Sequence, residues 1–198
     1  MDAAQSPVAE RRSRPDAPDR ILRATVRCIV QAGAVALTMH DVAAEAGVSK
    51  GLIHYHFHDK DTLLARTVEW ISHHLVAREQ AALAESTPRQ AVDDLWAWLS
   101  GELERGYVRV LIELAEWRNP LVRNAVRASA AARREAAAAS LEQLFTLLGL
   151  RPRLPPALLA DVVVAFVDGL AVATGLDEER NARAAFDVFW LSLLSLAE

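Results

Sequence analysis

The sequence has one cysteine and two lysines, and it lacks a long uninterrupted apolar run. Because Cys28 has no second cysteine as a partner, the chain cannot form an intramolecular disulfide. No apolar run reaches the roughly 18 residues that a membrane span needs, and the first residues lack the hydrophobic core of a secretory signal. We therefore expect a cytoplasmic protein that has no membrane partner.

An excess of positive charge is also missing, since the net charge of −4 argues against a globally basic coat for nucleic acid. The charge is nevertheless unevenly distributed. Residues 1–66 carry 9 Lys and Arg against 8 Asp and Glu, whereas residues 67–198 carry 13 against 18. Both lysines, Lys50 and Lys60, lie in the first part. The first third of the chain is therefore where we expect an anion to dock.

Apolar residues make up 52% of the chain and recur three and four apart, which is the spacing of amphipathic helices. Strand signals are few, and no internal repeat is found. We expect helices near residues 18–32, 38–46, 49–56, 61–84, 89–104, between 106 and 120, and near 121–148, 157–174 and 180–196. The pattern predicts an all-α protein with a disordered basic arm (1–17), a three-helix unit (18–64) and a larger helical unit (65–198).

The second and third helices have the signals of a helix-turn-helix. Thr38 can cap the second helix while Asp41, three residues later, completes a capping box. Gly47 provides the positive φ of a tight turn, and Ser49 can cap the third helix. Ile53 and Phe57 are four residues apart and predict the buried side of that third helix.

The opposite side of the third helix is expected to face solvent. At about 100° per residue, Lys50, Gly51 and His54 fall on this side, which could enter a major groove of DNA. Lys50 offers a positive donor, Gly51 permits close approach of the backbone, and His54 offers a ring nitrogen. The candidate DNA contacts are Thr38, Ser49, Lys50, Gly51, Leu52, His54, Tyr55, His56 and Lys60.

This passage resembles the DNA-binding domain of the TetR family of transcriptional regulators, over roughly residues 18–66. The matching residues are Thr38, Asp41-Val42-Ala43, Glu45-Ala46-Gly47-Val48-Ser49-Lys50-Gly51, Tyr55-His56-Phe57, Lys60 and Leu63-Leu64. The chain departs from the family at His54, where a tyrosine is most common. Beyond this region only the number and layout of helices carry over.

The resemblance implies a ligand-responsive regulator, expected to be a repressor. Residues 18–64 would bind double-stranded operator DNA, and residues 65–198 would bind a small-molecule effector and dimerise. A homodimer would place two recognition helices in successive major grooves of a near-palindromic operator, roughly 34–36 Å apart. The basic arm is either a solvated tail or a further contact to DNA.

Candidate effector contacts come from aromatic and acidic residues of the larger unit. Aromatic side chains commonly line pockets for apolar ligands, although core packing explains most tryptophans. Two glutamates near Trp117 could bind a cation or form a solvated helix face, and Asp168 interrupts an apolar run. The candidates are Trp96, Trp98, Glu113, Glu116, Trp117 and Asp168.

The last two expected helices have wider apolar faces than one small domain normally covers. Pairing with a second copy as a four-helix bundle would cover them. The candidate dimer residues are Leu158, Val162, Phe166, Leu170, Phe186, Phe189, Trp190 and Leu193.

Two rival functions follow from the same residues. A helical-bundle enzyme could use histidines and carboxylates, but the sequence shows no nucleophile-base arrangement or phosphate loop. His54, His56 and His58 alternate, and residues two apart on a helix point about 200° away from each other, so we expect no metal and no cofactor. A scaffold that binds only proteins leaves the Lys50, Gly51 and His54 side unexplained.

Overall fold

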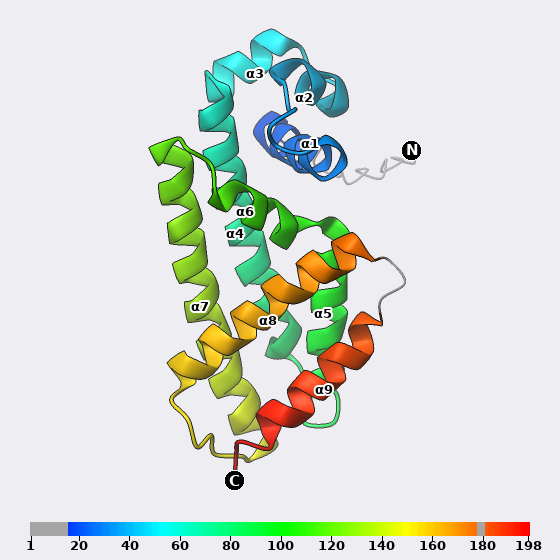
Figure 1. Ribbon diagram of the computed structural model, residues 1–198, viewed down its shortest axis with the longest axis vertical. Helices are drawn as coiled ribbons and strands as arrows, with labels where there is room; N and C mark the ends of the chain where they lie inside the picture. The colour runs from blue at the N-terminus through cyan, green and yellow to red at the C-terminus, as the bar shows by residue number, and fades with distance from the viewer. Residues whose placement is uncertain (1–15, 178–180) are drawn as a thin grey trace, which may run out of the picture.

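The computed structural model describes residues 16–177 and 181–198, and the chain is helical through most of them (Figure 1). Residues 1–15 of the expected basic arm (1–17) lie outside these ranges. The helices are α1 Ala17–Ala32, α2 Met39–Ala46, α3 Lys50–Phe57, α4 Lys60–Ala84, α5 Ala91–Arg105, α6 Tyr107–Ala115, α7 Pro120–Leu148, α8 Pro156–Leu176 and α9 Ala182–Leu194. Each helix expected from the sequence is present within a few residues, so the all-α prediction is confirmed.

The first three helices form a small unit at one end of the molecule (Figure 1). The Thr38 hydroxyl accepts from the Asp41 amide at 3.2 Å, and the Asp41 carboxylate accepts from the Thr38 amide at 3.2 Å. Gly47 ends α2 in the left-handed region with φ 63°, and Ser49 caps α3. The Arg20 guanidinium donates to the Ala46 carbonyl at 2.6 Å and ties α1 to the end of α2. The capping box and the tight turn predicted from the sequence are both confirmed.

Helix α4 joins this unit to the larger one without a break. It crosses the expected domain boundary after residue 64 and then packs along α7, which runs beside it down the long axis (Figure 1). Helices α5, α6, α8 and α9 complete the larger unit, in which α8 packs on α6 and α7. The boundary itself stays a prediction, because a continuous helix provides no structural division there.

The apolar residues of α8 and α9 divide between the core and the surface. Four of the eight candidate dimer residues are buried within the chain itself, so a second copy cannot reach them: Leu170, Phe186, Trp190 and Leu193. Phe166 and Phe189 are half-buried and stack on each other, with ring centroids 4.0 Å apart. Leu158 and Val162 are exposed, at 50% and 48% of their surface. As a dimer contact the eight residues stay a prediction, in which Leu158 and Val162 are exposed while the buried members fill the core.

Other apolar side chains on α8 and α9 are exposed, and they are Val172, Leu176, Val188 and Leu191. By length and composition alone, α8 is apolar enough to cross a membrane, and only 28% of its most apolar stretch is buried inside the chain. From the sequence we expect no membrane span, because Asp161 and Asp168 interrupt the apolar run of this helix. A composition test of this kind is also met by core helices of soluble proteins.

Candidate DNA-binding surface and ligand cavity

Helix α3 is anchored from behind by apolar side chains and presents its other side to solvent. Ile53 is 0% exposed and Phe57 is 4% exposed, whereas Lys50, Gly51 and His54 are all exposed. A Cβ added at Gly51 would meet nothing closer than the Ser49 hydroxyl at 3.9 Å. The fold of the chain therefore does not itself require glycine at residue 51, and the open backbone there is available to an external partner.

His54 has a defined orientation at the end of α3. Its Nδ1–H donates to the His58 carbonyl at 2.8 Å, and His58 has φ 58° just after the helix. Because Nδ1 carries the proton in this contact, Nε2 of the neutral ring is a hydrogen-bond acceptor. An acceptor on this exposed residue suits the exocyclic amino group of cytosine or adenine in a major groove.

The other candidate DNA contacts are distributed around the same end of the molecule. Thr38 is exposed but its hydroxyl is already used in the capping box, and Ser49 is likewise engaged as the cap of α3. Tyr55 is 75% exposed, while Leu52 and His56 are half-buried. Tyr55 and Lys50 are therefore the side chains of this group that extend most freely.

Lys60 is half-buried and already has partners within the chain. Its ammonium donates to the Val35 carbonyl at 3.0 Å and lies 5.3 Å from the centroid of the Trp117 ring. Burial lowers the pKa of Lys60, and the neighbouring Asp61 opposes this effect. Lys60 thus helps to fix the turn between α1 and α2, with donors still available for a phosphate.

Three of the candidate effector contacts lie near the joint between the two units. The Glu113 carboxylate accepts from the Ala34 amide, and Trp117 Nε1 donates to Asp61 at 2.7 Å. Asn119, which the sequence reasoning did not single out, donates to the second oxygen of Asp61 at 2.7 Å. Glu116 is exposed. In this structure Glu113 and Trp117 connect α6 to the helix-turn-helix unit.

The remaining candidates lie at three different hollows. Trp98 lines an internal cavity, and Trp96 packs on Phe186, with centroids 5.2 Å apart, beside an open surface hollow. Asp168 accepts from Arg133 at 2.5 Å, and both residues line another open hollow of about 540 Å³ between α6, α7 and α8. The structure therefore does not gather the six candidates into one site.

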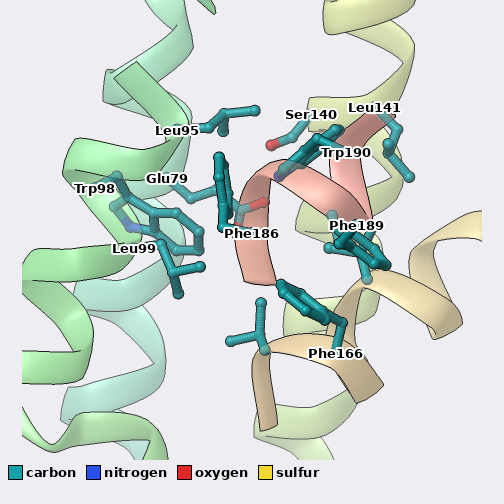
Figure 2. A pocket seen from close by; sticks show the side chains of 13 residues that line it. Glu79, Leu95, Trp98, Leu99, Ser140, Leu141, Phe166, Phe186, Phe189 and Trp190 are labelled. Carbon is teal, nitrogen blue, oxygen red and sulfur yellow. The ribbon is translucent and has the colours of Figure 1, made fainter. Parts of the chain in front are cut away.

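The internal cavity contains a residue that sequence reasoning missed. Glu79 on α4 lines it together with aromatic side chains of α5, α8 and α9, and it is only 8% exposed (Figure 2). Burial raises the pKa of Glu79 from 4.5 to about 7, against the opposing effects of a hydrogen bond with Ser140 and of Arg133. Glu79 lies four residues from both Leu75 and Leu83, which are buried, and this spacing was the available signal.

Over the described residues 16–177 and 181–198, no group of three or more His, Cys, Asp or Glu is placed so that it could hold a metal ion. Tyr55, His56 and Phe57 are in ring contact with one another in sequence order. The histidines of α3 are thus occupied with helix-end and aromatic contacts.

Taken together, the geometry is that of a helix-turn-helix protein with an all-helical second unit. Residues 21–67 match the family model described as "Bacterial regulatory proteins, tetR family". Over these residues the chain is similar to the DNA-binding domain of the TetR family of transcriptional regulators.

Other proteins are similar to this chain over part of its sequence or in their fold. The HTH-type transcriptional regulator BetI of Rhizobium meliloti (strain 1021) is 37% identical over 76 residues, which span 38% of this chain and 37% of that protein. A putative TetR-family transcriptional regulator from Rhodococcus sp. has the same fold, with a TM-score of 0.74, 24% identity, and 90% and 98% of the two chains covered. The structure named as a SmeT–triclosan complex has a TM-score of 0.66 and 20% sequence identity, and the match covers 89% of this chain and 90% of that chain. These similar proteins are named as transcriptional regulators or, for SmeT, by the compound in the complex.

Proposed function

We propose that this protein is a ligand-responsive repressor that binds a near-palindromic operator as a homodimer in the cytoplasm and is released by a small-molecule effector. The observation that carries the proposal is the exposed Lys50, Gly51 and His54 side of α3, held outward by buried Ile53 and Phe57. A recognition helix needs this arrangement, because its base-reading side chains must be free of the domain's own core.

The exposed apolar residues of α8 and α9 support a homodimer. Leu158, Val162, Val188 and Leu191 leave about half or more of their surface open. A second copy of the same two helices would bury these residues in a four-helix bundle, and this contact is self-complementary by two-fold symmetry. This pairing also covers the apolar side of α8 without a membrane.

Helix α6 supplies a physical connection between an effector and DNA. Leu111 and Ile112 of α6 line the open hollow between α6, α7 and α8, while the Glu113 carboxylate of the same helix accepts a hydrogen bond from the Ala34 amide. At the end of α6, Trp117 holds Asp61 at the start of α4. A ligand that displaced α6 would therefore shift the turn before α2 and, through α4, the orientation of α3.

The direct test is the affinity of the purified protein for DNA from upstream of its own gene, compared with random duplex of equal length. Fluorescence anisotropy at moderate salt should show a preference for the upstream DNA of about 1,000-fold or more, together with a steep salt dependence from released counterions. Equal affinity for the two duplexes would remove the basis of the proposal.

A further inference from the structure

The internal cavity combines a single charged group with a largely aromatic wall. Of the thirteen residues that line it, Glu79 is the one that can carry a charge. Figure 2 shows its carboxylate reaching toward the aromatic side chains of α9, with Trp98 of α5 nearby. Phe186 and Trp190 have ring centroids 5.8 Å apart, as do Phe189 and Trp190.

The positive groups near Glu79 are committed to other carboxylates. On α7, Arg133 donates to Asp168 of α8 at 2.5 Å. On α4, Arg78 forms two hydrogen bonds with Glu102 of α5, at 2.6 and 2.8 Å. Among the described residues, no Lys, Arg or His nitrogen lies within 4.0 Å of the Glu79 carboxylate. The residues of α9 that line the cavity beside Glu79 are all aromatic.

A buried carboxylate without a counter-ion is unfavourable, and a ligand that brings a positive charge removes this cost. Aromatic faces attract the same kind of ligand, because their quadrupole is negative above the ring. We infer that the cavity binds a small apolar cation, an ammonium group carried on hydrocarbon, with the Glu79 carboxylate as its counter-ion and the rings of α8 and α9 as its walls. This inference rests on the proposed function, because it names the class of effector.

A route to the cavity starts at the open hollow of about 540 Å³ between α6, α7 and α8. Arg133 lines both this hollow and a smaller internal space of about 20 Å³, and Glu79 lines that internal space as well as the cavity. The ion pair of Arg133 with Asp168 therefore stands between the outside and Glu79. A cation that enters would pass Asp168 first and exchange one carboxylate for another.

The cavity is small in this structure, with a volume of about 30 Å³, which is enough for one or two water molecules. A cation of several carbon atoms must therefore move the walls apart. Helices α8 and α9 carry most of the aromatic wall and the exposed apolar residues proposed for the dimer. Binding would thus change the part of the molecule that sets the distance between two copies.

Phenyltrimethylammonium and its neutral isostere tert-butylbenzene test the inference on the full-length protein by isothermal titration calorimetry from pH 6 to pH 8.5. The cation does not titrate, so any pH dependence belongs to the protein. We expect the cation to bind about tenfold or more tightly than the isostere. Its affinity should rise with pH up to about 7, because only ionised Glu79 is a counter-ion, and level off above.

The variant Glu79→Gln keeps the shape and removes the charge. It should lose about tenfold or more in affinity for the cation and lose the pH dependence, while Glu135→Gln, at an exposed residue of α7, should change neither. Circular dichroism establishes that each variant is folded. If a variant does not fold, the pH dependence of cation binding by the unmodified protein still tests the inference.

Equal binding of the two probes, binding of neither, or an unchanged affinity in Glu79→Gln would overturn the inference. Binding of upstream DNA is measured on the same samples. If DNA binding is specific and the cation fails, only the effector class is wrong; if specific DNA binding is absent, the proposed function fails whatever the cation does.

Discussion

In the N-terminal domain the buried residues are mostly apolar and the exposed side of α3 is polar, whereas the larger domain buries Glu79 and Glu102 and exposes valines and leucines on α8 and α9. Apolar side chains fill the core of the first domain, and α6 of the larger domain packs against its α1. The second has an unpaired internal carboxylate and an uncovered apolar surface. The proposed function accordingly assigns base reading to the first domain, and the binding of a ligand and of a second copy to the larger domain.

The largest expected effect comes from placing charge on the exposed apolar side of α8 or α9. Val162→Asp and Leu191→Asp should each convert the dimer into monomers, because a buried unpaired carboxylate opposes association. Affinity for a two-half-site operator should then fall by about 100-fold, since the second half-site is no longer bound intramolecularly. Analytical ultracentrifugation and anisotropy measure the two effects.

Leu121→Asp serves as the matched control, because Leu121 is also 50% exposed but lies on α7. It should leave both the mass and the DNA affinity unchanged. If Val162→Asp behaves like this control, the exposed apolar side of α8 and α9 is not the dimer contact.

The second effect concerns the buried carboxylate. The pKa of Glu79 is about 7 in the folded chain and 4.5 in the unfolded chain, so ionisation opposes folding, and stability is lost as pH rises from about 4.5 to about 7. Glu79→Gln avoids this loss and should raise the free energy of unfolding at pH 8 by about 2–4 kcal/mol. Urea unfolding at pH 8 and pH 5 should show the gain shrinking at the lower pH. A gain of the same size at both pH values would exclude ionisation as its cause.

The joint between the domains should give a smaller effect. Asp61→Ala leaves the Trp117 N–H and the Asn119 amide without their shared acceptor, and stability should fall by about 1–2 kcal/mol. Asp161→Ala, at a residue with only a long ion pair at 3.7 Å, is the control and should change little. Equal urea midpoints for the two variants would mean that the joint contributes nothing to stability.

The local signals in the sequence were sufficient for the helices and for the exposed side of α3. Thr38, Gly47 and Ser49 act on their own neighbours, so their spacing determines caps and turns before any tertiary contact forms. Ile53 and Phe57 lie on the side of α3 that the four-residue spacing indicates. This part of the structure depends on contacts that are short in sequence.

The internal cavity depends on contacts that are long in sequence, and there the predictions were incomplete. Glu79 was not singled out from the sequence, because the residues around it come from helices that are distant in sequence, α5, α7, α8 and α9. Phe186 and Trp190 lie on a helix that is apolar almost all round, and periodicity cannot indicate which side faces the chain's own core. Trp117 stays a candidate ligand contact, and its hydrogen bond with Asp61 at the joint is likewise a contact between residues distant in sequence.

The smallest expected effect separates the two lysines. Lys50→Ala removes an exposed ammonium on α3 and should alter base preference, whereas Lys60→Ala should weaken binding evenly and lower the salt slope by about one, if its ammonium also contacts a phosphate. Anisotropy over a range of salt concentrations measures both. Unchanged preference in Lys50→Ala would place α3 outside the groove.

The central claim is that α3 reads bases, and selection of binding sites from random DNA by the unmodified protein and by His54→Ala tests it most directly. We expect a two-fold symmetric site from the unmodified protein. In His54→Ala the preference should relax at one base pair in each half-site, by about 1–3 kcal/mol, with the rest of the site retained. The absence of any enriched site, or an identical site from both proteins, would contradict the role assigned to His54 on this helix.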